Sequence, residues 1–474
     1  MKKRTNRAPI LINERKQIHG PFTAKKIKKE YTYWKWQINA NETFTEEMTI
    51  FTLTGKNVTY ALAALESGHL AHIYYGKRAD DEDLSYLMRL NENPFVPKVN
   101  ERDMGTFMDT TPFEYPCHGI GDYREPAVSI MDEKGMTALD LRFVSYEMID
   151  GKPELYQQLE DCTVRLPATF AAKDEAQTLA ITMKDAHSGL TAILYYTVFA
   201  DLNAITRSVK FINGGDKAFK LTRALSACVD FDSDQYDFIT LNGSWARERV
   251  MERCRLHHGK QSIDSVKGES SHQNNPFAAL VSHNADEDMG EAYGFNLVYS
   301  GNFFAEAEVT QHKKTRFVMG INHFDFSWKL EPAQEFTAPE VVMVYSDKGI
   351  GEMSRTFHDL YRQHIIRGEY KDKRRPILIN NWEATYFNFN TEKLIDIAKQ
   401  ASQLGIEMLV MDDGWFGHRD SDNSSLGDWF VYEKKIDGGL KHLVDEVNKL
   451  GMKFGIWFEP EMISPDSELF KAHP

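Results

Sequence analysis

Cysteine is scarce in this chain of 474 residues, which contains four cysteines and no Cys-x-x-Cys motif. Cys117, Cys162, Cys228 and Cys254 are far apart in the sequence, so they indicate neither a disulfide framework nor a zinc site. Chains without disulfides are typical of reducing compartments, and we therefore predict a cytoplasmic protein.

Long hydrophobic runs and an excess of positive charge are also missing. No run reaches the length of a membrane span, and the basic stretch MKKRTNR at the start is not followed by an apolar h-region, so we expect neither a membrane protein nor a signal peptide. The net charge of -14 and the pI of about 5.6 argue against a nucleic acid or an anionic membrane as partner. The composition, 42% hydrophobic and 27% charged, is that of an ordinary globular protein.

The region from about residue 32 to residue 346 carries the pattern of β-strands. Short runs alternate apolar and polar residues or are rich in β-branched residues, as in TLAITMKD, TAILYYTVFA, ITRSVKFING and FNLVYSG. Turn residues such as glycine, asparagine and aspartate separate them. This pattern predicts a large antiparallel sandwich.

The pattern changes after this region. Residues 349–370 have apolar positions at helical spacing, which predicts a helical connector. The predicted helix at 391–405 has a threonine cap, Thr391, and a terminal glycine. Short buried strands and amphipathic helices alternate in the order 377–382, 391–405, 408–415, 440–451 and 453–462, and a third helix begins at 464.

Strand, helix and strand in units of this length predict parallel strands with crossover helices, either in a barrel or in a doubly wound sheet. No glycine-rich phosphate loop follows a strand, which weakens the dinucleotide-binding alternative. The three strands share polar and aromatic residues at their carboxyl ends, namely Asn380, Asn381, Trp382 and Glu383, then Asp412, Asp413 and Trp415, then Trp457, Glu459 and Glu461. Active sites of TIM barrels lie at this edge, so we interpret the strand ends as a site.

The adjacent carboxylates of Asp412 and Asp413 have three possible explanations. An Asx turn with a helix cap would account for them without any function. A metal site is less favoured, because a hard cation needs more oxygen ligands than this pair supplies and no histidine lies at ligand spacing. The neighbouring tryptophans favour a sugar, whose apolar face stacks on an aromatic ring while its hydroxyls donate to carboxylates.

Several long motifs carry a resemblance to a known family. PILINNWEATYFNFNTEKL, LVMDDGWFGHRDSDNSSLGDW and FGIWFEPEMISPDSELFKAHP are similar to the start of the catalytic barrel of bacterial α-galactosidases of glycoside hydrolase family 36. EYPCHGIGDYREPA, LNGSWARERV, GESSHQNNPF and YGFNLVYSGNF resemble the N-terminal β-supersandwich of that family. The resemblance extends from about Tyr31 over nearly the whole chain.

The resemblance implies a multidomain β then α/β fold, a large antiparallel β-supersandwich followed by the first three β/α units of a (β/α)8 TIM barrel. We expect an N-terminal extension at 1–22, the supersandwich at 23–346, the helical connector at 347–375 and an incomplete catalytic barrel at 376–474. Because a complete barrel takes about 250 residues, we expect the chain to be a fragment or a truncated reading frame.

The resemblance also implies roles for single residues. Asp412 and Asp413 match residues that bind galactose hydroxyls, and Trp382 and Trp457 match aromatic residues that wall the sugar pocket. Trp245 matches a tryptophan that the family also brings to the substrate. Core packing is the alternative for each of the three tryptophans.

Other residues receive supporting, loop-ordering or intersubunit roles. Glu459 and Glu461 suggest a catalytic pair, but in the family this segment is not the catalytic pair. We therefore assign them a supporting or structural role. His418, Arg419 and Asp428 are expected to order a loop. Family members form tetramers in which a loop lends an aspartate and an arginine to the neighbouring pocket; here Asn91 stands where the aspartate is expected, and Arg102 is the candidate arginine.

The site residues expected from the resemblance do not include the catalytic pair. The family's nucleophile and acid/base are two aspartates expected beyond Pro474, the nucleophile in a Lys-Trp-Asp motif that this sequence does not contain. We expect the full-length protein to be a homotetramer that hydrolyses terminal α-D-galactosides of the melibiose or raffinose type with retention, without metal or other cofactor. This chain alone is expected to be inactive. The alternatives are a non-catalytic galactoside-binding or vestigial protein, and α-N-acetylgalactosaminidase specificity.

Overall fold

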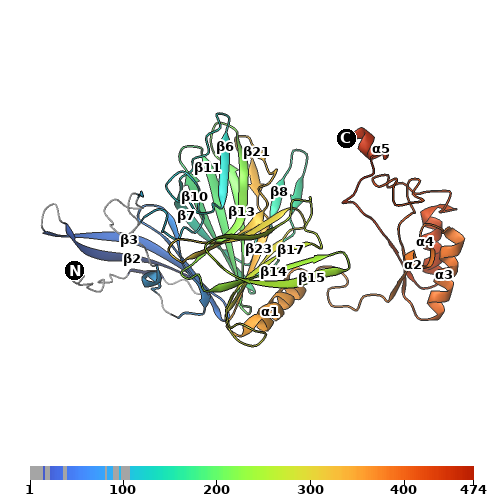
Figure 1. Cartoon of the computed structure of the whole chain (residues 1–474), viewed down its shortest axis with the longest axis horizontal. Helices are drawn as coiled ribbons and strands as arrows, with labels where there is room; N and C mark the ends of the chain where they lie inside the picture. The colour runs from blue at the N-terminus through green and yellow to red at the C-terminus, as the bar shows by residue number, and fades with distance from the viewer. Residues whose placement is uncertain (1–13, 17–21, 36–39, 81–82, 89–95, 98–106) are drawn as a thin grey trace. The chain divides into compact units, whose positions relative to one another are not determined.

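The computed structural model describes residues 14–16, 22–35, 40–80, 83–88, 96–97 and 107–474 (Figure 1). The chain forms two units, Met1–Ile366 and Arg367–Pro474. Their boundary falls inside the connector expected at 347–375. The helix of that segment, α1 (Gly349–His364), packs Met353, Phe357 and Leu360 into a core of the first unit.

The first unit is built mainly of antiparallel sheets, in which a sheet of ten strands has the order β15-β14-β17-β18-β23-β12-β11-β10-β7 with β22 beside β12. Its strands are β7 (Leu141–Asp150), β10 (Ala176–Asp185), β11 (Leu190–Phe199), β12 (Ala204–Asn213), β14 (Tyr236–Ser244), β15 (Arg247–Arg255), β17 (Asn274–Ser282), β18 (Ala292–Val298), β22 (Glu335–Thr337) and β23 (Glu340–Ser346).

A sheet of six strands has the order β16-β19-β20-β13-β21 with β6 beside β13, and a sheet of five strands runs from β1 to β5 in sequence order. The six strands are β6 (Val128–Asp132), β13 (Phe219–Phe231), β16 (Gly259–Asp264), β19 (Phe303–Val309), β20 (Thr315–Ile321) and β21 (Trp328–Leu330). The five strands are β1 (Glu14–Lys16), β2 (Phe22–Lys35), β3 (Ala40–Thr54), β4 (Val58–Ala64) and β5 (Leu70–Lys77). A 3-10 turn, η1 (Ser85–Leu87), and a hairpin of β8 (Tyr156–Gln158) and β9 (Thr163–Arg165) complete the unit.

The core of the first unit lies between these sheets. The rings of Phe295 on β18 and Phe317 on β20 stack with centroids 3.9 Å apart, which joins the sheet of ten to the sheet of six. The rings of Tyr60 on β4 and Tyr196 on β11 lie 5.8 Å apart and join the sheet of five. The predicted antiparallel sandwich is confirmed, and the period-two pattern of its strands reflects the burial of alternate side chains.

A buried charge network lies at this junction. Arg207 and Glu114 are 1% and 0% exposed, and Nη1 of Arg207 lies 2.9 Å from Oε1 of Glu114. The hydroxyls of Tyr60 and Tyr196 donate to the same carboxylate oxygen at 2.5 and 2.9 Å, and His72 Nδ1 lies 3.0 Å from the other oxygen. The buried carboxylate is therefore fully hydrogen-bonded, which is the condition under which a buried charge is tolerated.

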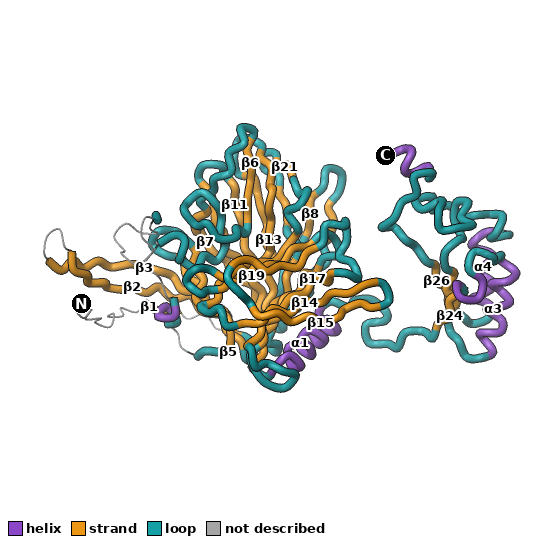
Figure 2. The backbone as a smooth tube through the Cα atoms, in the orientation of Figure 1, coloured by secondary structure: helices purple, strands orange, loops and turns teal. Residues whose placement is uncertain are grey.

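The second unit contains a parallel sheet of three strands in the order β24-β25-β26. Helices α3 and α4 pack against each other in this unit (Figure 2). Its elements are β24 (Leu378–Asn380), α2 (Trp382–Thr385), α3 (Thr391–Gln403), β25 (Met408–Met411), α4 (Gly439–Lys449), β26 (Lys453–Ile456) and α5 (Glu468–Ala472). The predicted alternation of strand and helix is confirmed. No helix in the described part of the chain is both long enough and apolar enough to cross a membrane.

The predicted cap of α3 is wrong by one residue. Asn390, not Thr391, is the N-cap, because its backbone is extended and its side chain accepts a hydrogen bond from Lys393 N at 2.9 Å. Thr391 Oγ1 instead donates to the carbonyl of Asp437 at 2.9 Å, a tertiary contact that links the start of α3 to the loop before α4.

We expect Arg207→Met to lower the free energy of unfolding of the first unit by about 3–5 kcal/mol, because the buried Glu114 carboxylate then loses its arginine counter-ion. Urea unfolding followed by far-UV circular dichroism measures the change. Arg78→Met is the matched control: Arg78 pairs with Asp80 at 2.9 Å with both side chains exposed, and its loss is expected to cost less than about 1 kcal/mol. Equal small losses in both variants would contradict a central role of the network.

Candidate functional site

The carboxyl ends of β24, β25 and β26 meet at one edge of the parallel sheet. Asn380 pairs in register with Val410, and Met411 pairs with Ile456. The residues that follow the strands, Asp412 after β25 and Trp457 after β26, are therefore brought to the same edge, as the sequence predicts.

Asp412 is held by the two asparagines at the end of β24. Asn380 Nδ2 donates to Asp412 Oδ2, and Asp412 N donates to the side-chain oxygen of Asn381 at 2.8 Å. Asn381 is fully buried, and its Nδ2 donates to Thr385 Oγ1 at 2.8 Å. Asp413 N donates to Asp412 Oδ1 at 2.7 Å. Because Asn380 binds the other oxygen, both carboxylate oxygens of the half-buried Asp412 are held in fixed directions.

Asp413 is buried, with 5% of its surface exposed, and forms an ion pair with Arg419. Nε of Arg419 donates to Oδ1 of Asp413 at 2.5 Å, and Nη1 donates to the carbonyls of Asp422 and Ser424 at 3.1 and 2.6 Å. No helix starts directly after Asp413 in this described stretch, so a helix cap does not explain the pair. Its carboxylate is instead the anchor of the loop that follows β25.

Aromatic residues follow the asparagines that hold Asp412. Trp382 is half-buried and is contacted edge-on by Tyr386 and Phe387, with centroids 5.3 and 5.0 Å away. Trp382 N donates to Asn380 Oδ1 at 2.7 Å, which ties this tryptophan to the partner of Asp412. Trp382 thus lies at the same strand end as the asparagine that binds Asp412, and part of its surface is exposed.

The tryptophans at the other strand ends differ from each other. Trp415 is buried and packs against Phe416, and its indole Nε1 donates to the carbonyl of Trp457 at 2.9 Å. Trp457 itself is half-buried, and its backbone N donates to Met411 O at 2.9 Å. Trp415 therefore belongs to the core of the second unit, whereas Trp457 has surface that a ligand can contact.

Trp245, Asn91, Arg102, His418 and Asp428 are further residues that the sequence analysis singled out. Trp245 lies in the first unit, between β14 and β15, and is 84% exposed, so it is not packed in a core. Asn91 and Arg102 lie outside the residues that the structure describes, and their intersubunit role stays a prediction. His418 N donates to Ser425 Oγ at 3.1 Å, and Asp428 accepts from Glu468 N at 2.9 Å, contacts within and across the loop that they were expected to order.

Two further residues at this edge were not predicted from the sequence. Lys435 Nζ donates to the carbonyls of Gly414 and Arg419 at 3.3 and 3.0 Å and pairs with Asp420 at 2.7 Å, so it supports the same loop. Tyr386, which contacts Trp382, has φ 47° and ψ -133°, an unfavourable backbone conformation for a residue with a side chain. Strain of this kind depends on tertiary contacts and leaves no pattern in the sequence.

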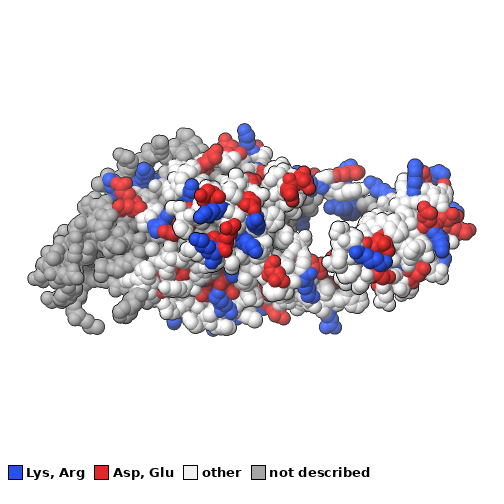
Figure 3. Space-filling view, turned by 90° about the horizontal axis from the view of Figure 1, so that it is seen from above, with Lys and Arg blue, Asp and Glu red and all other residues white. Residues whose placement is uncertain are grey.

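Neither the distribution of surface charge nor the metal-binding side chains of the described residues indicate a second functional site. Lys and Arg are interspersed with Asp and Glu on the described part of the face in Figure 3. Among the described residues, no three His, Cys, Asp or Glu side chains form a group that could hold a metal ion.

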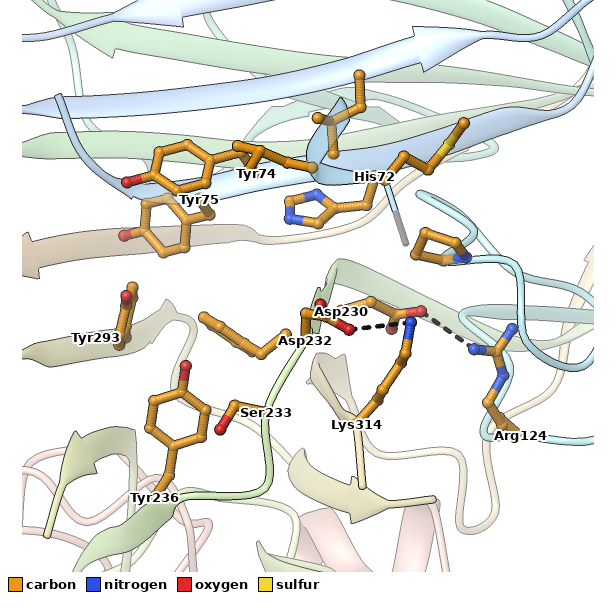
Figure 4. Close-up of a pocket in the computed structure, with 15 residues that line it drawn as sticks. His72, Tyr74, Tyr75, Arg124, Asp230, Asp232, Ser233, Tyr236, Tyr293 and Lys314 are labelled. Atoms are coloured by element: carbon orange, nitrogen blue, oxygen red, sulfur yellow. Dashed lines mark hydrogen bonds and ion pairs between the residues drawn. The ribbon is translucent and has the colours of Figure 1, made fainter. Parts of the chain in front are cut away.

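A cavity of about 290 Å³ lies in the first unit and is lined by tyrosine rings and charged side chains (Figure 4). Lys314 pairs with Asp232 at 3.0 Å, and Arg124 with Asp230 at 3.4 Å. None of the predicted site residues lines it. Because these charged groups already pair with one another, we assign no function to this cavity.

Comparisons with known proteins agree on one family. A model of the glycosyl hydrolase family 36 N-terminal domain matches residues 68–331, and a melibiase model matches residues 335–474. Alpha-galactosidase AgaA of Geobacillus stearothermophilus is 49% identical over 425 residues, covering 90% of this chain and 57% of its own length. Alpha-galactosidase Mel36A of Lactobacillus acidophilus is 44% identical, covering 91% of this chain and 58% of its own.

Solved structures show the same likeness. The crystal structure of AgaA matches with a TM-score of 0.83 at 48% identity and covers 90% of this chain and 58% of that one. Variants of AgaA have been solved in complex with raffinose and with stachyose. This chain thus spans a little over half the length of the relatives that it matches.

The pKa of Glu459 provides a pH-dependent test of this edge. Burial and the nearby carboxylate of Glu461 raise the pKa of Glu459 above its usual 4.5. The folded chain therefore keeps this proton to a higher pH than the unfolded chain, and the stability that this carboxyl contributes at low pH is lost as the pH rises through the raised value. We expect Glu459→Gln to raise the melting temperature of the second unit at pH 7 more than at pH 4.

The control for this measurement is Glu433→Gln, which changes an exposed glutamate of the same unit. Its effect on the melting temperature is expected to be small and the same at both pH values. A pH-independent effect of Glu459→Gln would contradict the proposed surroundings of that carboxyl.

Proposed function

The chain belongs to glycoside hydrolase family 36, and we propose that its second unit forms the galactose-binding part of a retaining α-galactosidase that acts on terminal α-D-galactosides of the melibiose and raffinose type. The observation that carries this proposal is the juxtaposition of two fixed carboxylates, Asp412 and Asp413, with the partly exposed Trp382 and Trp457 at one sheet edge. The alpha-galactosidase relatives support it, among them AgaA, of which one variant was solved with raffinose and another with stachyose.

The chemistry of galactose fits these groups. A pyranose presents an apolar C–H face that stacks on an indole ring, and its hydroxyls donate to carboxylates. Asp413 is nearly buried, so a sugar that fails to donate to it leaves a desolvated acceptor unpaired, at a cost of about 1–3 kcal/mol. Asp412 and Asp413 would in this way distinguish galactose from an epimer whose hydroxyl points elsewhere.

Hydrolysis requires groups that this sequence does not supply. Retention needs a nucleophile and an acid/base about 5–5.5 Å apart, and the Lys-Trp-Asp motif expected to hold the nucleophile does not occur among the 474 residues. In the complete reaction an aspartate attacks the anomeric carbon, an acid protonates the departing oxygen, and water hydrolyses the galactosyl-enzyme. We assign this chain binding without hydrolysis, and turnover of a chromogenic α-galactoside by the chain alone would contradict that assignment.

Exposed apolar residues support the view that the second unit is an incomplete barrel. Ile377 and Leu378, at the edge strand β24, are 53% and 54% exposed, and Phe458 after β26 is 49% exposed. Exposed apolar side chains beside open sheet edges are typical of surfaces that other elements cover. Cytoplasmic location and a homotetramer stay predictions for the full-length protein.

We expect Asp412→Asn and Asp413→Asn each to weaken the binding of methyl α-galactoside by at least about tenfold, because each removes a charged acceptor worth about 1.5–3 kcal/mol. Ligand-observed NMR titration of the chain measures such weak binding. Asp437→Asn is the matched control, since Asp437 is exposed and uses only its backbone carbonyl in its contact with Thr391. Unchanged affinity in both site variants would contradict the proposed function.

A further inference from the structure

The carboxylate of Asp413 has two unequal oxygens. Oδ1 accepts a hydrogen bond from Arg419 Nε at 2.5 Å. No residue in the described part of the chain donates a hydrogen bond to Oδ2. An ionised carboxylate can accept about four hydrogen bonds, so this nearly buried group retains unused acceptor capacity.

Arg419 is itself fixed from several sides. It is 3% exposed, and its Nη1 donates to the carbonyls of Asp422 and Ser424 at 3.1 and 2.6 Å. Its guanidinium lies over the rings of Phe387 and Phe416, with centroids 5.8 and 5.6 Å away. A side chain held in this way has one available orientation, and so has the carboxylate that it binds.

The positive charge of Arg419 partly offsets the negative charge of the carboxylates at this edge. Asp413 is joined there by the acidic side chains of Asp412, Glu459 and Glu461. The positive charge of Arg419 lowers the pKa of Glu459, while the negative charge of Asp413 raises it. Arg419 is thus a buried cation facing a set of carboxylates that would otherwise repel one another.

We propose that Arg419 is a positioning residue of the galactose site, which binds Oδ1 of Asp413 so that Oδ2 is left to accept a hydroxyl of the sugar. This inference rests on the proposed function and goes beyond the loop-ordering role expected from the sequence. Arg419 itself does not contact the sugar. A lysine offers a point charge without the planar fork that joins Asp413 to the two loop carbonyls, so it replaces the arginine only in part.

The test compares Arg419→Gln and Arg419→Lys in the 474-residue chain, with methyl α-galactoside and methyl α-glucoside as probes in ligand-observed NMR. We expect Arg419→Gln to bind the galactoside at least tenfold more weakly and to lose preference over the glucoside, with Arg419→Lys between it and the unchanged chain. Arg374→Gln is the matched control, because Arg374 forms an exposed ion pair with Glu407 at 2.6 Å before β24. Its affinity is expected to be unchanged.

A double variant separates positioning from a merely structural role. If Arg419 acts through Asp413, Asp413→Asn combined with Arg419→Gln binds no more weakly than Asp413→Asn alone, because the interaction is already lost. Losses that add up in the double variant would overturn the proposal. Melting temperatures establish that each variant is folded; should Arg419→Gln fail to fold, a folded Arg419→Lys with unchanged affinity would overturn it as well.

The two proposals fail in different ways. If the unchanged chain does not prefer the galactoside, the proposed function fails and the role of Arg419 fails with it. If the unchanged chain prefers the galactoside and Arg419→Gln binds it equally well, only the role of Arg419 is overturned.

Discussion

The buried ion pair between Asp413 and Arg419 is the interaction on which the candidate site depends. Taking two charges out of water is costly, and the cost is offset only where geometry is good and the remaining donors are satisfied. Here the guanidinium binds the carboxylate and two loop carbonyls, those of Asp422 and Ser424, at the same time. The pair therefore determines the path of the chain after β25 and the direction in which Asp413 points.

The first unit handles buried charge in a comparable way on a larger scale. Arg316 lies 3.0 Å from Asp122 and 2.8 Å from Asp230, and Arg124 binds the same two aspartates. In that network arginine nitrogens bind both oxygens of each carboxylate. Asp413 differs because, within the described chain, only its Oδ1 accepts a hydrogen bond, which comes from Arg419.

The architecture could be predicted from the sequence because periodicity reports burial directly. The alternation in β10 to β12 and the strand and helix units after residue 376 are local patterns, and the strand ends at Asn380, Asp412 and Trp457 follow from them. Contacts between distant residues could not be predicted in this way. The cap at Asn390, the support of the loop by Lys435 and the exposure of Trp245 depend on tertiary packing, as does the pairing of Asp413 with Arg419 rather than with solvent.

The central claim is that the carboxylates of Asp412 and Asp413 recognise the hydroxyls of a galactose ring. A crystal structure of this chain soaked with galactose tests it most directly. The account predicts the sugar at the carboxyl edge of β24 to β26, with ring hydroxyls within about 3 Å of both carboxylates and its apolar face on Trp382 or Trp457. Galactose bound elsewhere, for instance in the cavity of the first unit, with no hydroxyl on either aspartate, would contradict it.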